Sequence, residues 1–522
     1  MAGEEHQQHS SHYGHHFLVV AYGMQGHVNP ARALAHRLAK LSDVVGGCPI
    51  LATLSLHVAA HRRMFPAQLD PDAAGEEDEE EASDGVISYV PHSDSFDDGS
   101  LPRTPEDWAR RRRASRESLS AMLARFAGGG RPVTCVVCTL LVPAAVDAAT
   151  RHGVPFAVYW IQPATVLAAA YHYFHGYGET VAAADPAHEV SLPGLRRPLR
   201  VRDFPSYLVD TTGSPLARSV VGMFRELFES VDRWRPKVLV NTFDELEAGV
   251  LSEMKRHLDV FAVGPMVAGA GGGSGSSGAS NDEGRIHLYR HDDADRKRYM
   301  EWLGAQPESS VVYVSFGSIA THTLQQMEEV VQGLLQAGRP YLLAARSWHG
   351  LEDDGARRVL DNAAQSSGGR GTVVDWCDQP EVLAHPAVGC FVSHCGWNST
   401  LEAVAAGVPL VGVPSLFDQP TNTYLVVEEW GVGVRGERDG EGVLAATELA
   451  RCVELVMGQG TKATAIRERV KALREMAQQA ARAGGPAERN LEDFVNSVGD
   501  SFRPVGISVA EKTDESRTCS SE

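Results

Sequence analysis

The residues best suited to chemistry lie in one stretch, residues 376–419. Its centre, GCFVSHCGWNSTLEAVAAG, predicts a buried strand, a tight turn and a helix that ends at Gly407. A helix that starts beyond the carboxyl end of a strand favours anions, because its first N–H groups are unpaired and its dipole is positive there. We therefore expect a phosphate group at Asn398 and Ser399, and His394 can add a hydrogen-bond donor to it.

Ser399 is also followed three residues later by Glu402, which is the spacing of a capping box. On this pattern the two side chains satisfy N–H groups at the start of the helix, and Trp376 is an ordinary core residue. Taken singly, each of these features is as consistent with packing as with ligand binding. Only the stretch as a whole favours a binding site.

Two further candidates lie outside this stretch. His27 is in the loop GMQGHVNP, between an apolar run and a helical pattern, where a histidine is more often polar surface than a catalytic base. Asp293 and Asp295 supply the letters of a metal-binding DxD pair. In a chain with 67 acidic residues such a triplet arises by chance, and acids suit the start of the helix predicted there. We therefore expect no metal site.

The candidate residues belong to repeated strand, loop and helix units. Apolar runs followed by helical patterns predict parallel sheets covered on both faces, which is an α/β fold. The units form two groups, separated by residues 264–285, whose Gly and Ser content is typical of a flexible linker. Cys135 and Cys138 have the spacing of a redox pair, but in the run TCVVCTLL we expect them to pack in a buried strand.

Composition limits the function classes. The chain has 522 residues, 43% of them hydrophobic and 22% charged, which is typical of a folded globular protein. A net charge of −19 argues against nonspecific binding to nucleic acid or to an anionic membrane. We find no signal peptide, no membrane span and no Walker loop. Eight scattered cysteines fit a reducing compartment, so we expect a cytoplasmic protein. We also expect it to be a monomer and to bind small molecules.

Residues 376–419 resemble, nearly position for position, the signature box of the plant family-1 UDP-dependent glycosyltransferases, and the resemblance extends over most of the chain. It implies the GT-B fold, in which two Rossmann-like domains face each other across a cleft. The implied reaction is a single inverting displacement from UDP-glucose to a small hydrophobic acceptor, without a cofactor. The implied organisation is a disordered His-rich tail (1–15), an acceptor-binding domain (16–264), a linker (265–285), a UDP-sugar-binding domain (286–484), a helix returning to the first domain (485–500) and a disordered tail (501–522).

The resemblance also implies roles for single residues. Trp376 would stack on uracil, the backbone near Cys377 and Gln379 would pair with the base, and Glu402 would hold the ribose. The diphosphate would contact His394, Trp397, Asn398 and Ser399, with Ser318 reaching it from a neighbouring loop. Asp418 and Gln419 would bind the sugar hydroxyls, and a final Gln resembles glucose users rather than galactose users. His27 would be the general base. We expect the acceptor pocket to be lined by residues such as Trp160, Gln162, Tyr171 and Phe174.

One position departs from the family pattern. Members usually orient the histidine with an aspartate, and Thr139 stands at the corresponding place. A hydroxyl can hold a tautomer of His27 but cannot stabilise an imidazolium as a carboxylate does. The surrounding sequence resembles a branch in which Thr is usual, with flavonoid and anthocyanin glucosyltransferases and enzymes that esterify hormone acids. The acceptor group can therefore be a hydroxyl or a carboxyl, and the alternative function is a nucleotide-sugar-binding regulator without turnover.

Overall fold

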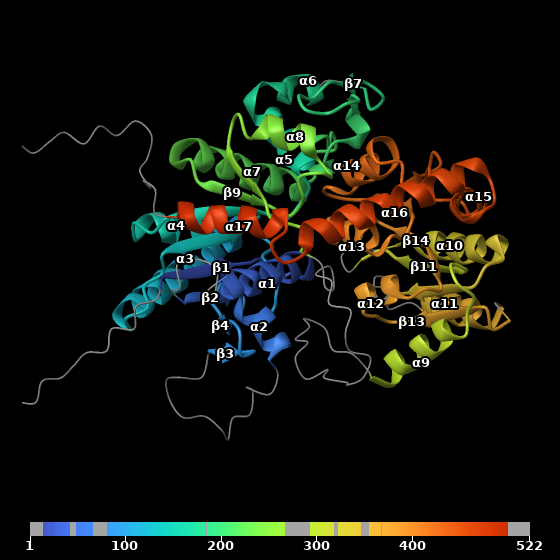
Figure 1. The fold of residues 1–522 in the computed structure, drawn as a ribbon, viewed down its shortest axis with the longest axis horizontal. Helices are drawn as coiled ribbons and strands as arrows, with labels where there is room; N and C mark the ends of the chain where they lie inside the picture. Colours follow the sequence, from blue (N-terminus) through green and yellow to red (C-terminus); the bar gives the residue numbers. More distant parts are fainter. Residues whose placement is uncertain are drawn as a thin grey trace, which may run out of the picture.

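The computed structural model describes residues 14–41, 49–65, 81–182, 185–266, 293–317, 322–345, 354–366 and 368–498. Ser318, most of the predicted linker and nearly all of both predicted tails lie outside these ranges. The described residues form two parallel sheets flanked by helices, which confirms the predicted α/β fold. Figure 1 shows the sheets in two lobes that lie side by side.

The first lobe is built on an eight-stranded sheet in the order β10-β9-β6-β5-β1-β2-β4-β3. Only the pairing of β3 with β4 is antiparallel within this described sheet. The central strands are buried along almost their whole length because helices cover both faces, as their apolar runs require. The strands are β1 (His15–Val20), β2 (Ile50–Ser55), β3 (Ala82–Ser83), β4 (Ser88–Tyr89), β5 (Cys135–Thr139), β6 (Phe156–Trp160), β9 (Lys237–Val240) and β10 (Asp259–Ala262).

Helices of the first lobe start with ordinary capping chemistry. Thr104 and Ser214 each accept a hydrogen bond from the backbone N–H three residues later, and proline fills the next position. The helices are α1 (Gln25–Lys40), α2 (Val58–Met64), α3 (Pro105–Gly128), α4 (Pro143–Arg151), α5 (Ala164–His172), α6 (Gly178–Ala182), α7 (Pro215–Trp234) and α8 (Ala248–Met254), and a small hairpin joins β7 (Glu189–Val190) to β8 (Leu199–Arg200).

The second lobe has a six-stranded sheet in the order β13-β12-β11-β14-β15-β16, and its strand pairs are parallel. Its strands are β11 (Val311–Ser315), β12 (Tyr341–Ala344), β13 (Gly371–Val374), β14 (Val388–Ser393), β15 (Leu410–Gly412) and β16 (Gly433–Arg435). Its helices are α9 (Asp293–Gly304), α10 (Leu324–Ala337), α11 (Asp354–Ser366), α12 (Gln379–Ala384), α13 (Trp397–Ala406), α14 (Gln419–Tyr424), α15 (Ala446–Met457) and α16 (Thr461–Ala481).

The last described helix, α17 (Pro486–Ser497), crosses from the second lobe to the first (Figure 1). Its buried Phe494 packs against Phe17 of β1 and Phe261 of β10, with ring centroids 5.8 and 6.0 Å away. Asn490 donates to the carbonyl oxygen of Ala262 at 2.8 Å. Apolar burial and directional bonds therefore both attach the end of the chain to the first sheet.

Direct hydrogen bonds also join the two lobes. The indole N–H of Trp397, at the start of α13, donates to the carbonyl oxygen of Asn241 just after β9, at 2.7 Å. Ser206 and Phe417 exchange two bonds of 2.7 and 2.8 Å. These contacts fix the carboxyl ends of the two sheets relative to each other, which is where an α/β sheet positions its binding loops.

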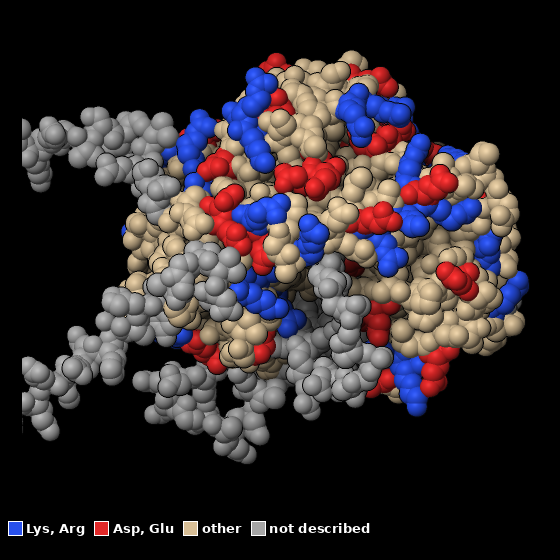
Figure 2. All heavy atoms as spheres, viewed as in Figure 1, with Lys and Arg blue, Asp and Glu red and all other residues tan. Residues whose placement is uncertain are grey.

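Charges of both signs are interspersed over the face drawn in Figure 2. In the described ranges, none of the helices is long and apolar enough to cross a membrane. The described residues also contain no group of three or more metal-ligating side chains, and Asp295 of the DxD letters pairs with Arg298 one turn along α9.

Candidate functional site

The residues expected to bind the diphosphate lie at the start of α13. Strand β14 ends at Ser393, Cys395 turns the chain with a φ of 59°, and the helix begins at Trp397. Gly407 closes the helix in the left-handed conformation, as predicted. The N-cap is Gly396, which supplies no side chain to the first N–H groups. These donors are thus arranged for an anion.

The predicted capping box of Ser399 and Glu402 is wrong. Because the helix begins at Trp397, Ser399 is the third helical residue and cannot cap it. Its hydroxyl instead accepts a hydrogen bond from Nε2 of Gln379 at 2.8 Å, and the same nitrogen donates to Glu402 Oε2 at 2.6 Å. The Gln379 side chain, for which the resemblance implied only a backbone role, therefore joins Ser399 and Glu402.

Glu402 is partly buried and accepts its bond from Gln379. Burial raises the pKa of its carboxyl to about 7, and the bond from Gln379 opposes that rise. Trp376 follows β13 and is half-buried, and Cys377 behind it is buried with its sulfur 3.3 Å from the Tyr313 hydroxyl. The residues expected to contact uracil and ribose thus lie beyond the carboxyl ends of β13 and β14 in the second sheet.

His394 is packed tightly between two backbone turns. A Cβ built on Gly317 would lie 2.8 Å from its Nε2, and one built on Gly396 would lie 2.5 Å from the same atom. A side chain at either position would therefore force the His394 ring to shift. Burial lowers the pKa of His394 to about 4, so the ring is neutral at pH 7 and can offer a phosphate an N–H but no charge.

The side chain of Trp397 has a structural role. Its side chain is 3% exposed and its indole N–H is bonded to Asn241, so the ring belongs to the contact between lobes. Only its backbone N–H, at the first position of α13, remains suited to a diphosphate.

The two residues expected to bind the sugar lie at the start of α14. Phe417 adopts a φ of 57°, and Gln419 follows as the first helical residue. Gln419 Oε1 accepts from the backbone N–H groups of Ser415 and Leu416 at 2.9 and 3.0 Å, which leaves its amide Nε2 as the donor. Asp418 accepts from Asn422 at 2.7 Å, and burial raises its pKa to about 6.

His27 and Thr139 meet on the acceptor side. His27 is in the first turn of α1, and its Nδ1 lies 3.3 Å from the Thr139 hydroxyl oxygen at the end of β5. That oxygen also accepts the N–H of Tyr22 at 3.3 Å and lies 3.5 Å from the carbonyl of Leu140. One consistent assignment has the hydroxyl donate to Leu140 and accept from both His27 and Tyr22. His27 then carries its proton on Nδ1 and leaves Nε2 free as a base.

Among the described residues, no carboxylate contributes to the pKa of His27, so none stabilises its charged form. Burial alone lowers that pKa to about 4. The imidazole is therefore unprotonated at neutral pH and available as a base, but it is a weak one.

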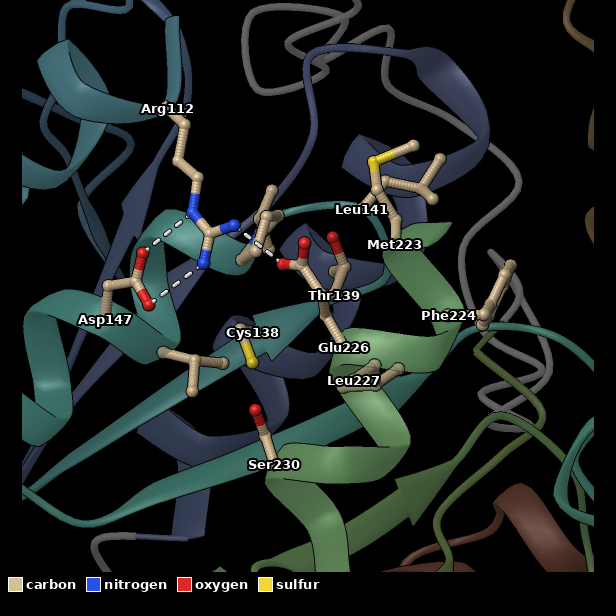
Figure 3. A pocket seen from close by; sticks show the side chains of 13 residues that line it. Arg112, Cys138, Thr139, Leu141, Asp147, Met223, Phe224, Glu226, Leu227 and Ser230 are labelled. Carbon is tan, nitrogen blue, oxygen red and sulfur yellow. Dashed lines mark hydrogen bonds and ion pairs between the residues drawn. The ribbon is translucent and has the colours of Figure 1, made fainter. Parts of the chain in front are cut away.

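A small cavity lies beside Thr139, between the end of β5, α4 and α7. We call it the α4–α7 cavity. Figure 3 shows Thr139 and Leu141 facing side chains of α7 across it, with Arg112 at its rim. Its lining is Arg112, Cys138, Thr139, Leu141, Val142, Pro143, Val146, Asp147, Met223, Phe224, Glu226, Leu227 and Ser230.

None of the four residues expected to line the acceptor pocket lines this cavity. Trp160 is 1% exposed and its N–H donates to Pro163, so it is core. Tyr171 stacks on His175 with centroids 4.0 Å apart, and Phe174 packs on Phe228. Gln162 remains near the site through a hydrogen bond that lowers the pKa of Asp418.

Three of the six non-glycine residues with positive φ in the described ranges lie close to these side chains in the chain. Leu141, Cys395 and Phe417 are non-glycine residues with positive φ, at 67°, 59° and 57°. One follows β5 and Thr139, one precedes α13, and one precedes Asp418. Such conformations cost about 1–3 kcal/mol each and persist where the surrounding structure imposes them, often at functional sites.

Comparisons with known proteins agree with this geometry. A family model described as UDP-glucoronosyl and UDP-glucosyl transferase matches residues 281–465. UDP-glycosyltransferase 75C1 of Solanum lycopersicum is 35% identical over 93% of this chain and 99% of its own length. The anthocyanidin 3-O-glucoside 5-O-glucosyltransferase of Verbena hybrida is 37% identical over 92% of this chain and 98% of its own length.

The structure of Os79 from O. sativa in complex with UDP matches with a TM-score of 0.73 at 28% identity, covering 92% of this chain and 100% of that chain. The fold and the site therefore define an enzyme of the GT-B class that uses a UDP-sugar. The chain belongs to the plant UDP-dependent glycosyltransferases, the family that its sequence resembles.

Proposed function

We propose that the enzyme transfers glucose from UDP-glucose, with inversion, to a hydroxyl or carboxyl group of a small plant metabolite. The observation that carries this proposal is the contact between the two halves of the site. Asn398 of α13, at the expected diphosphate position, donates to the carbonyl oxygen of Gly26, next to His27, at 3.1 Å. This contact supports a site in which the leaving diphosphate and the general base lie on either side of one reacting carbon.

In the proposed reaction, the acceptor oxygen attacks the anomeric carbon of glucose while the bond from that carbon to the UDP oxygen breaks. Nε2 of His27 takes the proton from an acceptor hydroxyl. The negative charge that develops on UDP is met by the N–H groups at the start of α13, by Asn398 and Ser399, and by neutral His394. These donors are positioned before the reaction starts.

The donor is held along the edge of the second sheet. Trp376 stacks on uracil, the backbone near Cys377 and Gln379 pairs with it, and Glu402 accepts from the ribose. Asp418 and the Nε2 group of Gln419 bind the glucose hydroxyls. The orientation of Gln419 by two backbone N–H groups supports this assignment, because it directs the amide nitrogen away from its own loop.

The acceptor class follows from the strength of the base. A histidine with a pKa of about 4 assists an acidic hydroxyl, or an acceptor that is already ionised, better than an aliphatic alcohol. Relatives named for crocetin, phloretin and anthocyanidin glucosides support acceptors of this kind. We further propose that the enzyme acts as a cytoplasmic monomer, although the crocetin relative is described as chloroplastic.

A panel of flavonoids, phenolic acids and hormone acids, each incubated with UDP-glucose, tests the proposal. We expect stoichiometric release of UDP and a β-glucoside or β-glucose ester, identified by NMR. His27→Ala should lower kcat/KM on a phenol by about 10²- to 10⁴-fold. Hydrolysis of UDP-glucose without transfer, or a product with retained configuration, would contradict it.

A further inference from the structure

The turn that presents Asp418 and Gln419 is held partly by the other lobe. It follows β15 of the second lobe and lies where that lobe meets the first (Figure 1). Phe417, the residue before Asp418, donates its N–H to the Ser206 hydroxyl oxygen at 2.7 Å. Its carbonyl oxygen accepts the N–H of Ser206 at 2.8 Å. Both backbone groups of Phe417 are therefore bonded to one residue of the first lobe.

The conformation of Phe417 depends on such bonds. Its φ of 57° is in the left-handed region, which is unfavourable for a residue with a Cβ atom and persists where the surroundings impose it. The bonds that Gln419 Oε1 accepts within the turn do not reach the backbone groups of Phe417. Rotation about φ of Phe417 would turn Asp418 and Gln419 in another direction. The two bonds from Ser206 therefore fix where both side chains point.

Packing in the first lobe holds Ser206 in place. The residue begins a short 3₁₀ turn, Ser206–Leu208, whose Tyr207 and Leu208 side chains are buried. The Tyr207 ring stacks on Phe224 of α7, with ring centroids 5.0 Å apart and planes 5° apart. Ser206 therefore keeps a fixed place relative to α7.

A second set of contacts joins the same segment to α14. The carbonyl oxygen of Asp203 accepts the Thr421 hydroxyl at 2.7 Å, and the Asp203 carboxylate lies 2.6 Å from a guanidinium nitrogen of Arg435. The same nitrogen donates to the carbonyl oxygen of Pro420 at 3.2 Å. The first lobe thus contacts the chain on both sides of the two residues expected to bind the sugar.

The uridine part of the donor site is built differently. The residues expected to bind uracil and ribose, Trp376 and Glu402, both come from the second lobe, and Glu402 is bonded to Gln379 of the same lobe. A change at Ser206 can therefore disturb the binding of glucose and leave the contacts to uridine intact.

We propose that Ser206 is a positioning residue for the donor sugar, and that its contact with Phe417 allows the enzyme to recognise the glucose part of UDP-glucose. Ser206 acts through Phe417 and does not itself contact the substrate. The glucose subsite is complete only while the two lobes are in contact. This inference rests on the proposed function, in which Asp418 and Gln419 bind the glucose hydroxyls.

Ser206→Ala tests the inference because it removes the acceptor of the Phe417 N–H. We expect KM for UDP-glucose to rise about 3- to 10-fold, which corresponds to one lost hydrogen bond. The dissociation constant of UDP, measured by calorimetry, should stay unchanged. The ratio of kcat/KM for UDP-glucose to that for UDP-galactose should fall, because loosely held side chains distinguish the two epimers less well. Ser206→Thr, which keeps the hydroxyl, should retain both properties.

Ser214→Ala is the matched control. The Ser214 hydroxyl also accepts one backbone N–H, that of Ala217 at 3.1 Å, but it does so within the first lobe at the start of α7. This variant should lower the melting temperature and leave KM and the sugar preference unchanged. Thr421→Val, which removes the hydroxyl that α14 donates to Asp203, should act like Ser206→Ala.

Two comparisons decide the outcome. Equal losses of affinity for UDP and UDP-glucose in Ser206→Ala, or an equal rise of KM in Ser214→Ala, would overturn the inference. Gln419→Glu separates it from the proposed function. If Gln419→Glu binds UDP-glucose as the wild type does, the proposed assignment of the sugar site fails. If Gln419→Glu weakens UDP-glucose binding and Ser206→Ala does not, only the inference about Ser206 is wrong.

Discussion

The side-chain amide of Asn398 donates to the carbonyl oxygen of Gly26 at 3.1 Å, which joins the first turn of α13 to the loop that carries His27. The two residues come from different lobes and are 372 positions apart in the chain. The donor site and the base thus share a direct polar contact.

Asn398→Asp should therefore be more damaging than Asn398→Ala. Alanine removes one donor, a loss of about 1–3 kcal/mol in transition-state stabilisation. Aspartate also removes the donor, and it places a negative charge toward the Gly26 carbonyl and the leaving diphosphate. kcat/KM for UDP-glucose and the affinity for UDP, measured by calorimetry, check both variants. Equal effects of the two substitutions would show that the charge of the diphosphate is not near this position.

At Gln419, replacement by Glu tests the role of the side-chain amide more specifically than truncation to Ala. Gln419→Ala removes the amide donor and also the oxygen that holds Ser415 and Leu416. Gln419→Glu keeps an oxygen for those N–H groups but loses the donor toward the sugar. We expect both variants to cost about 1–3 kcal/mol in transition-state binding of UDP-glucose, with UDP affinity nearly unchanged for Gln419→Glu. If UDP and UDP-glucose lose affinity equally in Gln419→Glu, the residue has only a structural role.

Some of this site could be predicted from local sequence. The strand β14, the turn and a helix closed by Gly407 follow from apolar and capping patterns. The helix start was misplaced because Ser399 and Glu402 fit a capping box, while the true start is fixed by the left-handed Cys395, whose conformation no local pattern indicated.

The α4–α7 cavity could not be predicted in this way. Its walls combine Thr139 and Leu141 with side chains of α7, and which face of α7 meets β5 depends on tertiary packing. Trp160 illustrates the same limit. It is placed at the end of β6 like a pocket residue, but it packs against Phe224 and Phe228 of α7, with centroids 5.6 and 6.2 Å away, and is core.

The raised pKa of Glu402 predicts how binding depends on pH. Its carboxyl, usually near 4.5, titrates near 7 in the folded protein because ionisation is opposed by burial. The folded state therefore holds a proton that the unfolded state releases between about pH 4.5 and 7, and this residue makes the protein less stable as pH rises through that window. The ionised form accepts ribose hydroxyls best, so affinity for uridine, which lacks a titrating phosphate, should rise with pH through about 7.

Glu402→Gln separates these effects. It should lessen the fall in melting temperature between about pH 4.5 and 7, and it should make uridine affinity independent of pH in this range. Uridine affinity that keeps the same pH dependence in Glu402→Gln would assign the titration to another group.

The pair of Thr139 and His27 yields the most direct test of the base. In the wild type, neutral His27 is the active form. With UDP-glucose saturating, so that Glu402 no longer affects donor binding, kcat/KM for the acceptor should fall only as pH drops toward the His27 pKa of about 4 and stay level from about pH 5 upward. Thr139→Asp places a carboxylate where the hydroxyl lies 3.3 Å from Nδ1. Stabilising the imidazolium raises the pKa of His27 by about 1–3 units, so the acidic limb should move to higher pH.

A stronger base should help weakly acidic acceptors most. Thr139→Asp should therefore raise kcat/KM on an aliphatic alcohol relative to an acidic phenol. Thr139→Ser, which keeps the hydroxyl, should match the wild type. Thr139→Val leaves the N–H groups of Tyr22 and His27 without their acceptor, a cost of about 1–3 kcal/mol, and should lower kcat/KM about 10-fold without moving the limb. Because Thr139 also lines the α4–α7 cavity, melting temperature and acceptor KM are measured for each variant. An unmoved limb in a folded Thr139→Asp enzyme would show that His27 does not act as the base.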